Sequence, residues 1–296
     1  MLRKFFAAAA VIALLSSPAG ASRLRLSAPV EAPVGQPFFV ELRTNEQLGE
    51  VTVRWREKEY TLVPRLNTVR TVRGFPNDSK LIGQTLPLVL EFEHEGRTIV
   101  VERDITATAF DYPRQEITVA PKMVNPPKSE NERIARERRL TNKALTANTK
   151  GAPFTKKLFR PVAGIPTGYF GGFRVYNGVP RSGHGGLDLR AAVGTSVKAA
   201  ADGTVLLSGD HYFSGGCVYL DHGGGVISAY FHLSKSLVQK GQRVKAGDII
   251  ALSGATGRVT GPHLHLGIYA GGTWLDALPL IGEAELPESV VSVMEY

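Results

Sequence analysis

Apolar and polar residues alternate along much of the first third of the chain. Residues 51–56 and 88–93 each place an apolar side chain at every second position. The apolar positions of these two runs are Val51, Val53, Trp55, Leu88, Leu90 and Phe92. A period of two is typical of strands with one buried face, and no helical period competes with it here. We therefore predict a small β domain over residues 22–120, and an immunoglobulin-like sandwich fits this pattern.

The pattern changes at residues 121–150, where two prolines are followed by a charged run with few apolar residues. Ser129 and Glu132 have the spacing of a capping box, and Glu132 and Arg136 are four residues apart, as in a helical ion pair. We predict a short solvated helix that connects two domains. Its arginines form either a solvated face, as charge runs usually do, or a polymer-binding patch. They are Arg133, Arg136, Arg138 and Arg139.

Short β-type runs separated by glycine turns fill residues 151–296. Asp202-Gly203 lies between two such runs, and glycines on both sides flank the run at 217–220. This pattern predicts an antiparallel β domain with long loops. Residues 240–251 resemble the turn and strand of lipoyl and biotinyl carrier domains, but without a convincing modifiable lysine this similarity concerns the fold only.

The first 21 residues have the pattern of a secretory signal peptide. Arg3 and Lys4 precede an apolar run that ends at residue 15, and Ala19-Gly20-Ala21 offers a small-residue cleavage site. We expect cleavage after Ala21 and export, to the periplasm first of all, with secretion or attachment to the cell wall as alternatives. The apolar run is short for a membrane span, so we expect no stable membrane insertion after cleavage; an uncleaved anchor is the alternative.

Composition adds two limits. The single cysteine, Cys217, cannot form an internal disulfide, so the domains must be stabilised by their cores. The net charge of +8 favours an anionic partner, which a cell wall, a nucleic acid or a lipid headgroup could each supply. The sequence carries no indication of an oligomeric state.

Two histidine motifs stand out in the second half of the chain. His184 and Asp188 are four residues apart in a glycine-rich segment, and His263 and His265 follow Pro262. Glycine and proline disfavour helices, and in an extended segment residues two or four apart point to the same side. Two imidazoles and one carboxylate leave a coordination position free, as in catalytic zinc sites. Either motif alone could be a chance match, but both in one domain favour a metal site.

Several further motifs accompany these histidines between about residues 159 and 280. In chain order they are Tyr169-Phe170-Gly171, His184-x-Gly186-x-Asp188, Gly203-x-Val205, Tyr230-Phe231-His232-Leu233-Ser234, Gly254-x-Thr256-Gly257 and Gly261-Pro262-His263-Leu264-His265. In this set and order, the C-terminal domain resembles the lysostaphin/LytM-type zinc metallopeptidases, which cut peptide cross-links of bacterial peptidoglycan. The fold class expected is therefore mainly β, with an antiparallel peptidase domain behind the sandwich and the helical connector.

The resemblance also implies a site and a reaction. His184, Asp188 and His265 correspond to the ligands of one Zn²⁺, while His263 and His232 correspond to the catalytic histidines. We assign the general base to His263 and transition-state stabilisation to His232. The implied activity is hydrolysis of peptidoglycan stem peptides by a metal-activated water, with no nucleic-acid partner.

Other functions stay open beside this one. Some LytM-type domains have lost ligands and activate other wall hydrolases, and a wall-binding module without chemistry is a third possibility. All five site residues are present here, which favours the enzyme. The bond is a direct D,D cross-link, a glycine bridge or a terminal residue, and the signal peptide favours the first. The N-terminal domain either positions the enzyme on the wall or partly covers the groove.

Overall fold

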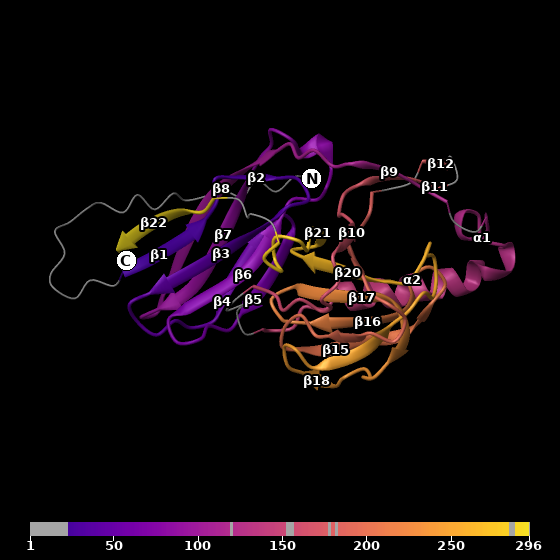
Figure 1. The fold of residues 1–296 in the computed structure, drawn as a ribbon. Helices are drawn as coiled ribbons and strands as arrows, with labels where there is room; N and C mark the ends of the chain where they lie inside the picture. Colours follow the sequence, from indigo (N-terminus) through magenta and orange to yellow (C-terminus); the bar gives the residue numbers. More distant parts are fainter. Residues whose placement is uncertain are drawn as a thin grey trace.

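The computed structural model describes residues 23–118, 121–151, 157–176, 179–180, 183–283 and 288–295. The predicted signal peptide lies outside the described residues. In the part of the chain that is described, no helix is long and apolar enough to cross a membrane. Figure 1 shows two bodies built mainly of strands, with one longer helix, α2, running beside the second of them.

The first body is a sandwich of a four-stranded and a five-stranded sheet. The smaller sheet has the order β22 (Val290–Glu295), β1 (Arg23–Ala28), β3 (Pro37–Thr44) and β6 (Thr68–Gly74). The larger has the order β2 (Glu31–Pro33), β8 (Arg97–Thr108), β7 (Thr85–His94), β4 (Val51–Trp55) and β5 (Lys58–Leu62). A short 3-10 turn, η1 (Ser79–Leu81), precedes β7.

The predicted alternation decides which side chains fill the sandwich. In β4 the buried residues are Val51, Val53 and Trp55, and Trp55 is fully buried. Its ring meets Phe38 and Phe75 edge to face, with centroids 5.5 and 5.1 Å away. The indole N–H donates to the carbonyl of Gly74 at 3.0 Å, so its one polar atom is satisfied inside the core. The predicted β domain is present, and its immunoglobulin-like topology stays a prediction.

The last strand of the chain belongs to this sandwich. β22 pairs antiparallel with β1 along its whole length, from Arg23 opposite Glu295 to Ala28 opposite Val290, and Figure 1 shows the yellow strand beside the indigo one. Arg103 also donates to the Val290 carbonyl and to Ser292. The division made from sequence assigned all of 151–296 to the second domain; the pairing places 290–295 in the first.

The connector contains β9 (Arg114–Ile117), α1 (Pro121–Val124), the 3-10 turn η2 (Lys128–Glu130) and α2 (Asn131–Leu145). The predicted capping box is wrong: Ser129 lies inside η2, and the residue that caps α2 is Glu130, which makes no side-chain cap bond. The helix is exposed on its outer face only. Glu137 and Ala144 are buried, because the inner face packs against β15 of the second body.

The second body is built around a ten-stranded sheet in which every described pairing is antiparallel. Its main path is β10 (Pro166–Gly168), β13 (Leu187–Arg190), β20 (His263–Ala270), β17 (Val226–Ser236), β16 (Gly215–Asp221), β15 (Gly203–His211) and β18 (Arg243–Val244). β14 (Ser196–Lys198), β19 (Ile249–Ser253) and β21 (Thr273–Leu275) pair off this path. β11 (Phe173–Tyr176) forms a separate small sheet with β12 (Val179–Pro180) and β9. The predicted mainly β class with an antiparallel C-terminal domain is confirmed.

The two bodies are in direct contact, and one part of the contact requires a glycine. A Cβ on Gly225, in the turn before β17, would overlap the ring of Tyr60 from the sandwich. Gly225 also has a φ of +74°, which glycine adopts without strain. On the other side of the contact, Asp276 accepts from Gln36 at 3.2 Å and its N–H donates to the Gly35 carbonyl at 2.9 Å. The sandwich therefore packs directly against the second domain.

Candidate metal centre and adjoining cavity

The register of three neighbouring strands brings the centre together. β20 lies between β13 and β17, with His265 directly opposite Asp188 on one side and Phe231 on the other. His263 is two residues earlier on β20 and points to the same face. His184 lies in the loop before β13, where its backbone exchanges hydrogen bonds of 2.9 and 2.8 Å with the segment at Gly171 and Gly172.

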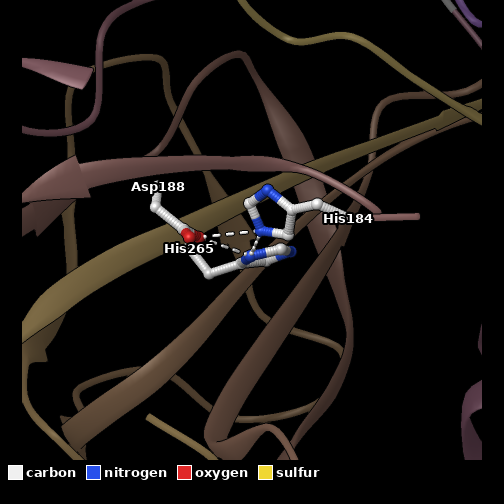
Figure 2. A group of neighbouring side chains, drawn as sticks. All are labelled: His184, Asp188 and His265. Carbon is white, nitrogen blue, oxygen red and sulfur yellow. Dashed lines mark hydrogen bonds and ion pairs between the residues drawn. The ribbon is translucent and has the colours of Figure 1, made fainter. Parts of the chain in front are cut away.

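Three donor atoms form a nearly equilateral triangle (Figure 2). His184 Nε2 lies 2.9 Å from His265 Nδ1 and 3.0 Å from Asp188 Oδ1, and the latter two atoms are 2.8 Å apart. Tetrahedral zinc with bonds of about 2.0–2.1 Å holds its ligand atoms roughly 3.3 Å apart. The three side chains need only small rotations to reach that spacing, so this donor set fits zinc, with a fourth position left for another ligand.

Neighbouring groups hold the two imidazoles in the orientation a metal requires. His184 Nδ1 donates to the Tyr169 carbonyl at 2.8 Å, which leaves the lone pair of Nε2 for the metal. The His265 ring stacks on Phe231, with centroids 5.1 Å apart and planes 2° apart. A Cβ on Gly186 would lie 2.6 Å from His265 Nε2, so only glycine leaves room for this ring.

Charge at the centre is set by Asp188, whose side chain is nearly buried. Burial by itself raises the pKa of this carboxyl, but the close contacts with His184 and His265 outweigh burial and hold the pKa well below its ordinary value. Asp188 is therefore a carboxylate at neutral pH, which is the form that binds a cation.

His232 and His263 lie next to the triangle, with ring centroids 4.8 Å apart. His232 Nδ1 donates to the Thr256 carbonyl at 2.9 Å, and His263 Nδ1 donates to the Gly261 carbonyl at 2.8 Å. The Gly254-x-Thr256-Gly257 motif thus orients His232. Each ring is left with Nε2 as a proton acceptor, and His263 Nε2 is 3.6 Å from Asp188 Oδ1.

The backbone and the environment of His232 are both unusual. Its φ is +63°, a left-handed conformation that is uncommon for a residue with a side chain. Burial first, and the neighbouring His265 and His263 second, lower its pKa to about 3. The fold therefore holds this imidazole neutral beside the centre.

A cavity of about 870 Å³ opens beside these residues. His184, His232 and His265 lie on one part of its wall, together with Phe231. The remaining wall includes side chains outside the five predicted site residues. They are Pro76 and Asn77 of the sandwich, Ile134, Glu137, Arg138 and Thr141 of α2, and Arg258 and Trp274 of the second domain. The sequence indicated Arg138 only as one of a run of arginines. Its position at the cavity was not predictable, because no local pattern shows which face of a helix meets a distant strand.

Residues 182–277 match the sequence model of Peptidase family M23. This part of the chain is a peptidase family M23 domain. The predicted family resemblance is thus confirmed, and with it the presence of a metallopeptidase-type fold around the histidine motifs. The five predicted site residues all lie inside the matched range.

The names of curated relatives of this M23 domain describe enzymes that act on peptidoglycan. Peptidoglycan DD-endopeptidase ShyA from Vibrio cholerae is 44% identical over 95 residues, which are 32% of this chain and 22% of that protein. DD-carboxypeptidase/endopeptidase Mpg from Neisseria meningitidis is 43% identical over 82 residues, 28% of this chain and 19% of that protein. The chain spans only about a fifth of the length of these relatives.

A solved structure extends the likeness beyond the M23 domain. The crystal structure of a candidate M23 peptidase from Pseudomonas aeruginosa superimposes with a TM-score of 0.62 at 27% identity. It covers 84% of this chain and 94% of its own, so the shared fold includes part of the N-terminal half as well as the M23 domain.

Proposed function

We propose that this protein is a zinc-dependent endopeptidase that hydrolyses peptide cross-links of bacterial peptidoglycan, with direct D,D cross-links as its substrate. The observation that carries the proposal is the triangle of His184, Asp188 and His265 with two further imidazoles beside it. His184, His232 and His265 of this group line a cavity. The names of the relatives ShyA and Mpg support the choice of substrate.

The three ligands would hold zinc, which when bound acts as a Lewis acid on the scissile carbonyl and makes water nucleophilic near neutral pH. Asp188 contributes the negative charge and lies opposite His265 on the neighbouring strand, so both are positioned by the sheet itself. The Tyr169 carbonyl keeps His184 in the required tautomer.

The flanking imidazoles move protons. His263, with Nδ1 fixed on the Gly261 carbonyl, accepts the proton of the attacking water at Nε2 and passes it to the leaving amine. His232 has the same tautomer, because Nδ1 donates to the Thr256 carbonyl. It therefore stabilises developing negative charge only once its own Nε2 carries a proton, and because its pKa is lowered to about 3 this protonated form arises only while that negative charge lies beside it.

A regulator without catalysis is the second candidate, because it would use the same fold. Loss of a metal ligand is the feature expected of such a protein, and here all three ligand atoms lie within 4.8 Å of one another. This favours the enzyme.

The proposed function implies that the protein is exported from the cytoplasm. The signal peptide predicted at residues 1–21 would carry the chain to the periplasm, where peptidoglycan lies, and cleavage after Ala21 would release it. Relatives that act on peptidoglycan support a location outside the cytoplasm.

The test is digestion of purified sacculi by the full-length protein loaded with zinc, with the new termini identified by mass spectrometry. We expect release of peptides cut at D,D cross-links, and loss of both bound zinc and activity in His184→Ala. His94→Ala is the matched control, since His94 lies on β7 of the sandwich and should leave both unchanged. Zinc binding without any cleavage would favour the regulator.

A further inference from the structure

Part of the cavity wall lies outside the M23 domain. Ile134, Glu137, Arg138 and Thr141, spaced three or four residues apart, form one face of α2 and line the same cavity as His184 and His232. The groove beside the metal centre is therefore completed by the helix that the sequence predicted as a connector, with its arginines as either a solvated face or a polymer-binding patch.

This helical wall is held in place. Glu137 is buried and accepts from the backbone N–H of Tyr212 at 2.7 Å, while Arg133 bridges Glu137 and Asp210 at 2.7 and 3.1 Å. Thr141, one turn further on, and Tyr219 of β16 line the same cavity. A surface held by such contacts is preorganised: it has its shape before a ligand binds.

Two neighbouring charged residues of α2 that line the cavity, Glu137 and Arg138, differ in their contacts. Glu137 is occupied by Arg133 and the Tyr212 amide. Arg138, the next residue, is exposed into the cavity and has no ion pair or hydrogen bond with any residue that the structure describes. Arg258 also lines the cavity, and its guanidinium carbon lies 4.9 Å from the centre of the Phe213 ring. Arg138 is therefore the cationic group that the helical wall offers to a ligand.

We propose that Arg138 binds a free carboxylate of the substrate peptide and so determines specificity for anionic stem peptides. This rests on the proposed function for the class of substrate. Stem peptides carry free carboxylates on their acidic residues and chain ends, and the planar guanidinium donates two parallel hydrogen bonds to such a group. Arg138 takes no part in the chemistry; it positions the peptide along the groove.

The experiment compares two synthetic cross-linked peptides that differ only in whether the acidic side-chain and terminal carboxylates are free or amidated. Full-length zinc-loaded wild type, Arg138→Gln and Arg138→Lys are measured with both peptides. Arg139→Gln is the matched control, because Arg139 is the next residue on the same helix, equally charged and exposed, but does not line the cavity.

For the free-carboxylate peptide we expect Arg138→Gln to raise KM about tenfold with little change in kcat, and Arg138→Lys to recover part of the loss. The amidated peptide should show the higher KM already with wild type and respond little to Arg138→Gln. Arg139→Gln should behave as wild type with both.

Two results would overturn the inference. One is an equal KM for both peptides in wild type and Arg138→Gln; the other is faster cleavage in Arg138→Gln, which would make α2 a cover over the groove rather than a binding wall. Binding of fluorescently labelled peptides separates this failure from that of the proposed function. Arg138-dependent preference for the free carboxylate without cleavage supports the inference and refutes the hydrolase, whereas cleavage without that preference refutes the inference alone.

Discussion

Replacing Glu137 by alanine should detach α2 from the M23 domain. Glu137 is 7% exposed, and its carboxylate makes two contacts, one with the Tyr212 backbone N–H and one with Arg133, each at 2.7 Å. Without the carboxylate the N–H loses its acceptor, and it is left buried and unpaired unless the helix moves away and lets water in.

The magnitude follows from the burial of each contact. A buried hydrogen bond to a charged group contributes about 1.5–3 kcal/mol. The Arg133 pair is an i, i+4 pair whose arginine side chain is 36% exposed, so solvent screening limits it to about 0.3–0.5 kcal/mol. The amide bond dominates, and we expect Glu137→Ala to weaken docking of α2 by about 2–3 kcal/mol.

Amide hydrogen exchange followed by mass spectrometry measures this loss directly. If α2 exchanges through undocking, its amides should exchange roughly 30- to 150-fold faster in Glu137→Ala, while the strands of the M23 domain keep their rates. Glu137→Gln retains an acceptor for Tyr212 and should show a smaller increase. Glu132→Ala is the control, because Glu132 is exposed in the first turn of the same helix. Unchanged exchange of α2 in Glu137→Ala would show that this contact does not hold the helix.

Two further predictions concern stability. His222 is buried and hydrogen-bonded to the Asp202 carbonyl and to Ser228, each at 2.7 Å, and burial lowers its pKa below the ordinary 6.5. As the pH falls the unfolded chain takes up the proton first, so the free energy of unfolding decreases below about pH 6.5. Urea unfolding at about pH 5 and about pH 7.5 should show a smaller loss of stability in acid for His222→Gln than for wild type, and an identical loss would exclude His222 as its source. Gly225→Ala should lower the free energy of unfolding by about 1–3 kcal/mol, because the residue has a positive φ and the added Cβ would overlap Tyr60. Gly241→Ala is the control, because Gly241 has a φ of +87° and no atom within 4 Å of the added Cβ, so this variant measures the cost of the backbone conformation alone. Equal losses in the two variants would mean that the contact between the domains contributes nothing.

The sequence by itself determined the features that depend on neighbours along the chain. Alternation at Val51, Val53 and Trp55 marks a half-buried strand, because successive side chains of a strand point to opposite faces. The spacing of His263 and His265 places both on one face of β20 for the same reason. The class of fold, the family and the candidate ligands were accessible from such local patterns.

Only the tertiary structure decided which distant segments meet. The metal triangle requires Asp188 opposite His265, and a shift of the β13–β20 register by one residue would turn one of them to the other face. Equally, no local pattern indicates that 290–295 pairs with 23–28, or that Glu137 meets Tyr212 and thereby turns Arg138 toward the cavity. A periodic pattern defines a buried face but not its partner, since any apolar face of matching shape satisfies it; the partner is chosen only when the whole chain packs.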